Sequence, residues 1–145
     1  MNDFTGLFRQ GAELFEAELY WEAIDCFKAL TELHPNEPLL DDVYLNLAVC
    51  YMKLNLFHEA KELFLPVYNE EIGDGLFEVG GNNFGSTRAR AALGLIRINL
   101  ALDDIEQAEV LLEELRNNES GIEKGNKRIT FFELGLQEIN LLKAQ

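Results

Sequence analysis

The chain is short of positive charge. Its 145 residues hold 12 lysines and arginines against 26 aspartates and glutamates, which gives a formal net charge of −14. Nucleic acids and anionic membrane surfaces are bound through clustered cations, so this balance argues against both as partners. A partner with a basic or mixed surface is easier to accommodate. The simpler interpretation is that the excess acid keeps the protein soluble.

Cysteine and histidine are scarce. Cys26 and Cys50 form no CxxC pair and no zinc-ligand spacing, so no metal or redox site is expected. His34 and His58 are the only histidines, and neither has a Ser or Cys nucleophile at a recognisable spacing. The glycine-rich stretches GDGLFEVGG and GGNNFG lack the Lys-Ser/Thr pair of a phosphate-binding loop. We therefore expect neither an enzyme nor a cofactor.

Long apolar runs are also missing. No stretch approaches the roughly 18 apolar residues of a membrane-spanning helix. The first residues, MNDFTGLFRQGAELFEAE, lack the basic start and long apolar run of a signal peptide. We expect no membrane insertion and a cytoplasmic location. With 48% hydrophobic residues, the chain has the composition of a folded protein.

Apolar residues recur at three- and four-residue spacing through most of the chain, which predicts helices. Asn2 or Asp3 is suited to cap the first helix. Pro66 stands where the fourth helix should continue, so we expect a kink or an early end near Leu65. The expected helices cover about 4–17, 20–33, 41–54, 57–65, 88–102, 105–117 and 128–143.

Two segments are predicted to be loops. The first, NEEIGDGLFEVGGNNFGS at 69–86, contains five glycines and three asparagines. Within it, GLFEV at 75–79 is a candidate short strand. The second, NNESGIEKGN at 117–126, is polar throughout most of its length.

Two segments share a pattern typical of helical repeats. They are LFRQGAELFEAELYWEAIDCFKALTELHP at 7–35 and YLNLAVCYMKLNLFHEAKELFLPV at 44–67. Large apolar residues alternate with small ones at positions where helices would approach closely. The small residues are Gly11, Ala23, Ala48 and Ala60. This arrangement predicts stacked helix pairs with a concave face.

These segments resemble the tetratricopeptide repeat, a helix pair of about 34 residues. The first unit matches at Leu7, Gly11, Leu14, Tyr20, Ala23, Phe27 and Pro35, and the second at Tyr44, Leu47, Ala48, Tyr51, Phe57, Ala60 and Phe64. A weaker third unit has Ala92, Leu95, Ile105, Ala108 and Leu112.

The resemblance implies an all-α fold, a right-handed α-α solenoid of about three helix pairs with a C-terminal capping helix. The units would cover about 4–37, 41–68 and 88–117, and the closing helix about 128–144. The glycine-rich loop would be an insertion between pairs two and three. Residues 1–145 would then form a single repeat domain.

Members of this family bind extended peptides or helices on the concave face, which the first helix of each pair lines. The resemblance therefore implies a largely apolar peptide-binding groove, in which Asn46 could bond the ligand backbone. The alternative is that the last helix or the 69–86 loop fills this groove. The corresponding residues are Phe8, Ala12, Phe15, Leu45, Asn46, Val49, Met52, Arg90, Leu93, Arg97 and Leu100.

Arg90 and Arg97 are seven residues apart and share one helix face. They could pair with an acidic partner or with the protein's own acidic residues. Co-chaperones of the family hold a terminal carboxylate with a clamp of Lys, Asn and Arg, which only Asn46 and Arg90 match here. A chaperone-tail co-chaperone is therefore not expected, because the other clamp positions hold Phe8, Ala12 and Gly94.

The expected function is a protein–protein interaction module, an adaptor or chaperone in assembly or secretion. Its acidity and apolar groove are similar in type to the repeat-containing chaperones of secretion systems. The alternative is a self-associating structural module or homodimer, in which Phe77 and Phe84 of the loop enter the groove of the same or a neighbouring molecule. Trp21 follows an inward position, so we expect it to face outward, where it either covers a neighbouring side chain or anchors a dimer contact.

Overall fold

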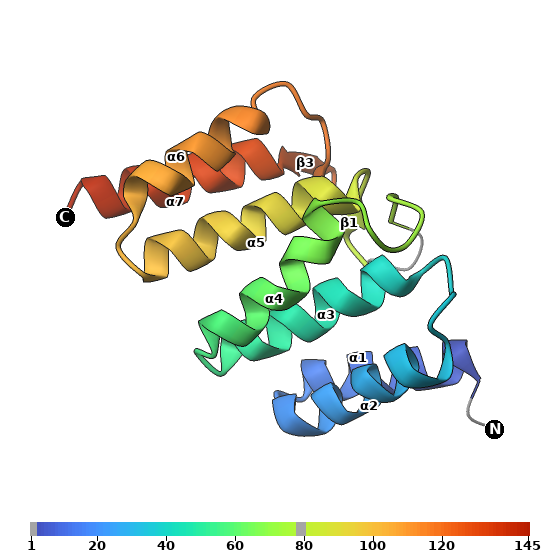
Figure 1. The fold of residues 1–145 in the computed structure, drawn as a ribbon. Coiled ribbons are helices and arrows are strands. Elements are labelled where there is room, and N and C mark those ends of the chain that lie inside the picture. Colours follow the sequence, from blue (N-terminus) through green and yellow to red (C-terminus); the bar gives the residue numbers. More distant parts are fainter. Residues whose placement is uncertain (1–2, 78–80) are drawn as a thin grey trace.

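The computed structural model describes residues 3–77 and 81–145, which form seven helices and three short strands. Most of the described chain is helical, as predicted, and the small sheet is an addition to the expected all-α fold (Figure 1). The helices are α1 (Phe4–Glu16), α2 (Tyr20–Leu33), α3 (Leu40–Lys53), α4 (Phe57–Tyr68), α5 (Thr87–Ala101), α6 (Ile105–Glu114) and α7 (Phe131–Lys143).

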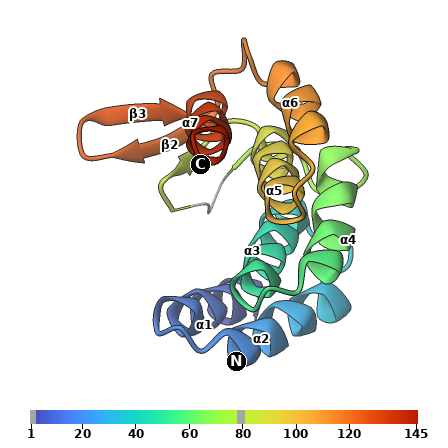
Figure 2. The ribbon, with the colours of Figure 1, turned by 90° about the vertical axis from the view of Figure 1, so that its left-hand side faces the viewer.

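Each helix from α1 to α6 packs against the next one, and α7 packs against both α5 and α6. The helices α1, α3, α5 and α7 lie along the inner side of a curved array, with α2, α4 and α6 outside them (Figure 2). The inner helices also touch each other, α1 with α3 and α3 with α5. The array therefore has a concave side that α1, α3 and α5 share.

The turn between the two helices of a pair has the same geometry in all three pairs. Glu18, Asn55 and Asp103 have positive φ angles of 62°, 60° and 62°. In each turn the next residue donates its N–H back across the turn, from Leu19 to Leu14, from Leu56 to Tyr51 and from Asp104 to Asn99, at 2.8–2.9 Å. This 6→1 bond and left-handed residue define a Schellman motif.

A fully buried alanine lies five residues after each of these left-handed residues. The three alanines, Ala23, Ala60 and Ala108, are all 0% exposed. Their small side chains allow the second helix of each pair to approach its neighbours closely. The turn geometry and the buried alanine therefore recur together in all three helix pairs.

The early end of the fourth helix near Leu65, one of the two predicted outcomes, is not found, because α4 continues through Pro66 to Tyr68. A proline inside a helix removes one backbone hydrogen bond. Phe64 and Val67, on either side of Pro66, are buried at 0% and 2% exposure. Their packing holds the last turn of α4 in place despite the missing donor.

The second predicted loop, at 117–126, is only partly confirmed, since residues 121–124 form a strand and 121–130 make up a β-hairpin. Its strands β2 (Gly121–Lys124) and β3 (Lys127–Thr130) are joined by Gly125 and Asn126, and Gly125 has a φ of 64°. A glycine with positive φ at the first central position suits a two-residue hairpin turn. The predicted boundary of the closing helix at about 128 is wrong. Residues 128–130 belong to β3, and α7 begins after Thr130 with a capping box to Glu133.

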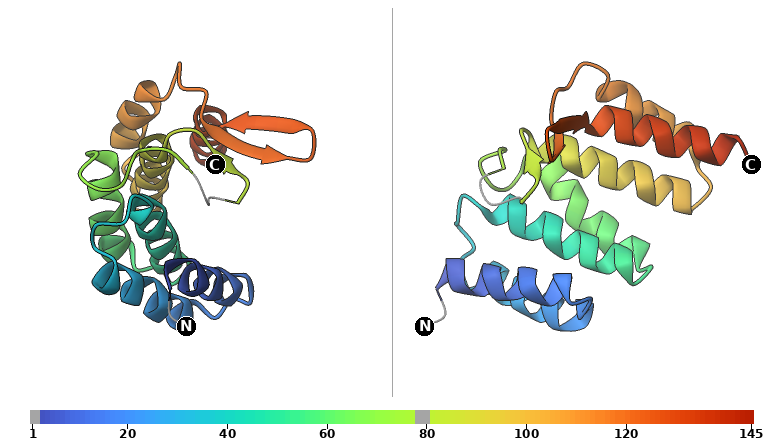
Figure 3. Two further views of the ribbon diagram at one scale, coloured as in Figure 1. Left: turned by 90° about the vertical axis from the view of Figure 1, so that its right-hand side faces the viewer. Right: turned by 180° about the vertical axis from the view of Figure 1, so that it is seen from behind.

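The hairpin joins a third strand from the glycine-rich loop. β1 (Asn83–Phe84) pairs antiparallel with β2, and the sheet order is β1-β2-β3. The hairpin projects from the open side of the curved array (Figure 3). Of the candidate strand 75–79, Leu76 makes one isolated bridge to Ser86, while Glu78 and Val79 lie outside the described residues.

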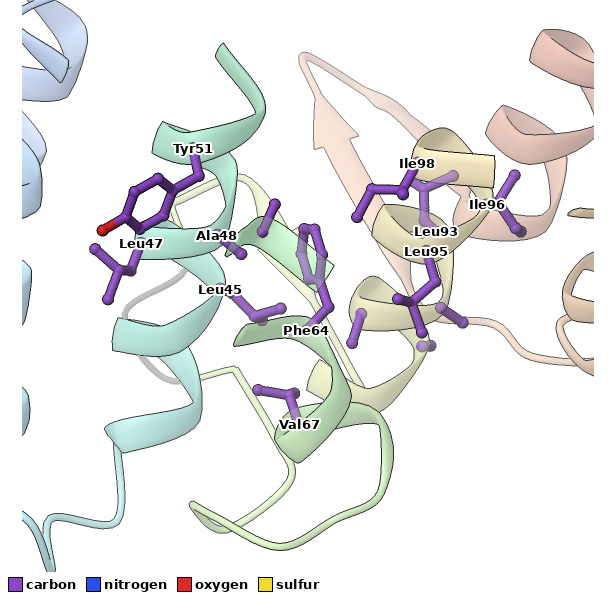
Figure 4. Packing of buried hydrophobic residues seen from close by; sticks show 14 of the residues in the cluster. Leu45, Leu47, Ala48, Tyr51, Phe64, Val67, Leu93, Leu95, Ile96 and Ile98 are labelled. Carbon is purple, nitrogen blue, oxygen red and sulfur yellow. The ribbon is translucent and has the colours of Figure 1, made fainter. Parts of the chain in front are cut away.

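Two aromatic side chains pack into spaces that glycines leave open. A Cβ on Gly11 would lie 2.7 Å from Phe27, and a Cβ on Gly94 would lie 2.4 Å from Phe64. Both rings are 0% exposed. Phe64 lies between α3 and α5, with Leu45 and Ala48 on one side and Leu93 on the other (Figure 4). Gly11 of α1 and Gly94 of α5 therefore set how closely these helices approach their neighbours.

None of the helices in residues 3–77 and 81–145 has the length and apolarity needed to cross a membrane.

Candidate functional site

The concave side of the array holds a cavity of about 640 Å³. It is called the groove below. Helices α1, α3 and α5 each supply residues to it, at the positions that the sequence analysis assigned to a binding surface. The lining residues from these helices are Phe8, Ala12, Phe15, Glu16, Leu45, Asn46, Val49, Arg90, Leu93 and Arg97.

Two predicted groove residues, Met52 and Leu100, do not line the cavity. Both are half-buried and pack against the core in the last turns of α3 and α5. The cavity lies beside the earlier turns of these two helices, where the insertion and the hairpin stand opposite. The repeat spacing assigned the whole length of each helix to the groove, and the structure encloses only part of it.

Along α1, Phe8, Ala12 and Phe15 follow one another at helical spacing and face the groove. Phe8 packs edge-on against Phe27 with ring centroids 5.8 Å apart, and Phe15 packs against Tyr20 at 5.4 Å. Both α1 rings are therefore held in place by rings of α2. An ordered aromatic wall loses little side-chain entropy when a ligand binds.

On α3 and α5 the apolar residues differ in how much surface they present. Leu45 and Leu93 are only 3% and 1% exposed, so they form the floor of the groove and belong to the core. Val49 is half-buried and offers more of its side chain. Asn46 donates its Nδ2 to the Asp42 carbonyl at 2.8 Å, which fixes its amide on the α3 surface.

A fourth wall of the groove consists of Phe77, Gly81, Asn82, Asn83, Ile122, Phe131 and Leu134. Of these, only Phe77 was placed in a groove from the sequence, through the self-association alternative. The insertion, β2 and α7 thus enclose the groove, and a cavity remains between them and the three helices. Of the two loop aromatics, Phe77 lines the groove, while Phe84 lies 4.6 Å from the guanidinium of Arg128 beside a different cavity.

The insertion is anchored by a buried carboxylate at the start of α3. Oδ2 of Asp41 accepts hydrogen bonds from the Thr87 hydroxyl at 2.7 Å and from the Gly75 N–H at 3.1 Å. Burial raises the pKa of Asp41, and these hydrogen bonds oppose the shift. A Cβ on Gly73 would lie 2.2 Å from the Asp41 carboxyl carbon, so the loop backbone passes directly over it. Asp41 therefore ties α3, α5 and the insertion together.

The two arginines of α5 have different surroundings. Arg97 forms a two-pronged ion pair with Glu138 of α7, with Nε and Nη2 each 2.9 Å from a carboxylate oxygen. Arg90 is half-buried as a residue, but its Nη1 is fully enclosed and has no hydrogen-bond partner within residues 3–77 and 81–145. Burial and the nearby charge of Arg97 lower the pKa of Arg90 to about 9, so it stays cationic at neutral pH. Of the two arginines, Arg97 pairs with the protein's own Glu138, while Arg90 forms no ion pair with any acidic residue in the described part of the chain.

The two histidines lie away from the groove lining. His34 packs edge-on against Phe4 at 5.8 Å, and His58 lies 3.1 Å from Glu62 on the exposed face of α4. Across the described residues, His, Cys, Asp and Glu side chains form no cluster of three that could hold a metal ion. The groove therefore offers apolar contact, amide groups, the guanidinium of Arg90, the ion-paired Arg97 and the carboxylate of Glu16.

Trp21 points outward as predicted, with 55% of its surface exposed. It belongs to α2, one of the helices on the outer side of the array (Figure 2).

Comparison of the chain with protein-family models and with curated proteins finds no match.

Proposed function

We propose that the chain is a helical-repeat scaffold of the tetratricopeptide type, a right-handed solenoid of three helix pairs closed by α7. Its function is to hold a segment of another protein in the groove. The recurrence of the Schellman turn and the buried alanine in three successive pairs supports the repeat assignment. The groove itself is the observation that carries the function, since it is a pre-formed apolar cavity of about 640 Å³.

The chemistry of the groove favours a peptide segment as occupant. Phe8, Phe15 and Val49 offer apolar surface, while Asn46 and Asn82 place amide groups on opposite walls. Apolar pockets with a few polar groups at the edge suit a peptide, whose side chains alternate with backbone donors and acceptors. With a net charge of −14, the protein is a poor binder of nucleic acid. We therefore assign it as a cytoplasmic adaptor or chaperone for a partner in assembly or secretion.

The test is a charge placed in the middle of the groove. Val49→Glu should abolish capture of the partner from native lysate, because a carboxylate would be desolvated against Phe8 and Leu93. Val49 is half-buried, so the new glutamate side chain can point its carboxylate toward water when the groove is empty. The far-UV circular dichroism should therefore not change.

Val110→Glu is the matched control, because Val110 is 57% exposed on α6. A partner identified by mass spectrometry with wild type and Val110→Glu, but absent with Val49→Glu, supports the groove. A synthetic segment of that partner should then bind at least about 10-fold more weakly to Val49→Glu in calorimetry. Equal affinity for both variants would refute the assignment.

A second candidate is self-association through the insertion, which the position of Phe77 in the groove favours. In this alternative the loop of one molecule occupies the groove of another, forming a homodimer. Deleting residues 74–85 should then convert the dimer to a monomer, as judged by the oligomeric mass from light scattering. An unchanged oligomeric state and an unchanged partner affinity would exclude self-association.

A further inference from the structure

The guanidinium of Arg90 faces the groove and forms no ion pair with the acidic residues that the structure describes. Nη1 of Arg90 is buried and unpaired within the described part of the chain, and the guanidinium lies 6.0 Å from the ring centroid of Phe64. The protein carries 26 acidic residues, yet none of those described forms an ion pair with Arg90. Burying a cation without a partner is costly, so a folded chain seldom keeps one without a use for it.

The neighbouring Arg97 shows what a satisfied guanidinium looks like on the same helix. Glu138 accepts hydrogen bonds from Nε and Nη2 of Arg97, which neutralises the charge at that end of the groove. Glu16, the acidic residue of the groove lining, is exposed on α1. Among the described lining residues, the buried charge without a partner is therefore that of Arg90.

We propose that the segment held in the groove carries an Asp or Glu side chain that pairs with Arg90. The inference rests on the proposed function and specifies the partner's chemistry. A carboxylate matches one guanidinium in charge and in its two-pronged geometry. Desolvation inside the groove strengthens such a pair relative to one on the surface.

The acidic residue lies inside the bound segment and is not its terminal carboxylate. Apolar lining continues on both sides of Arg90, with Phe8 and Val49 toward α1 and with Phe131 and Leu134 toward α7. A segment that fills the groove must therefore place apolar side chains both before and after the acid. The recognised pattern is one acidic residue flanked by apolar ones.

A display selection tests this pattern without knowledge of the natural partner. Random peptides are presented with both ends fused to carrier protein, so that only side chains supply carboxylates. Wild type should enrich sequences with a single internal Asp or Glu between apolar residues. Arg90→Met should enrich apolar sequences without the acid, and Arg90→Gln serves in its place if the Met variant loses its circular dichroism signal.

The matched control removes a two-pronged ion pair that lies away from the groove. The double variant Arg116→Met, Glu113→Gln should select the same acidic pattern as wild type, because neither residue lines the groove and Arg90 is unchanged. For a selected peptide, replacing Asp by Asn should weaken binding to wild type about 10- to 100-fold and to Arg90→Met by about 2-fold or less. Fluorescence anisotropy measures all four affinities of this cycle.

The outcomes separate the two proposals. Apolar peptides enriched by wild type without any acidic preference would overturn the Arg90 inference and leave the groove function standing. The same acidic preference in wild type and in Arg90→Met would also overturn it. No enrichment by wild type would remove the groove function, and this inference with it.

Discussion

Gly94 of α5 gives the sharpest test of how the helices fit together. Gly94→Ala adds one methyl group, and the ideal position of that group is 2.4 Å from Cζ, 2.5 Å from Cε1 and 2.6 Å from Cε2 of Phe64. Phe64 is fully buried between α3 and α5 (Figure 4). A rigid ring in such a place cannot move aside without shifting one of the two helices.

The expected change combines two opposing terms. Overpacking of a core by one methyl group costs about 1–3 kcal/mol, and a rigid aromatic neighbour puts this site near the upper end. Replacing glycine by alanine inside a helix returns about 1 kcal/mol. Gly94→Ala should therefore lower the free energy of unfolding by about 1–2 kcal/mol. In a domain of this size that corresponds to a fall in Tm of about 2–8 °C.

Gly135→Ala in α7 is the control for helix propensity. Its added methyl would meet the Cδ1 atoms of Leu112, Ile96 and Leu93, at 3.0, 3.4 and 3.7 Å, which are the ends of flexible side chains. This variant should be neutral or more stable by up to about 1 kcal/mol. Urea unfolding followed by far-UV circular dichroism compares the two. If Gly94→Ala were as stable as Gly135→Ala, the close approach of Phe64 to α5 would not be what limits helix packing.

Two further variants probe the insertion anchor and the repeated turn. Thr87→Val removes the hydroxyl that donates to buried Asp41 without changing the shape of the side chain, so urea unfolding should show a free energy of unfolding lower by about 1–3 kcal/mol. The control Thr31→Val on α2 should change it by no more than about 0.5 kcal/mol. Equal losses in the two variants would refute the role of Asp41 as an anchor. Glu18→Gly should raise the melting temperature, because glycine adopts the positive φ of 62° without the roughly 1 kcal/mol strain of a side chain, whereas Glu22→Gly inside α2 should lower it by a similar free energy. A lower melting temperature for Glu18→Gly would contradict this account of the turn.

The sequence predicted the helices well because their signals are local. Apolar spacing set their number and order, and the repeat pattern placed Phe8, Val49 and Arg90 along one cavity. These positions follow from helical geometry once the first helix of each pair is known. The extent of the cavity did not follow, since Met52 and Leu100 share the same helix faces and lie beyond its end.

The fourth wall could not be read from local patterns. β1 and β2 pair although α5 and α6 separate them in the sequence. Nothing in the sequence near Asn83 identifies Ile122 as its partner. The hairpin itself did have a local signal, the Gly125-Asn126 turn between IEK and KRI.

The role of Asp41 was hidden for a similar reason. An acid in the first turn of a helix has a sufficient local explanation in the helix dipole. Its partners Gly75 and Thr87 come from the insertion and from α5, and only the folded chain brings them together.

The pairing of β1 with β2 has a consequence for the order of folding. Contacts among the helices are mostly between neighbours in the chain, which can form as soon as each pair is complete. The register Asn83↔Ile122 instead closes a loop that contains two whole helices. The entropy lost on closing that loop is offset only after α5 and α6 have packed. We therefore expect the wall that faces α1, α3 and α5 to be assembled last. During synthesis the concave surface therefore exists as an open, three-sided face before the chain can enclose it.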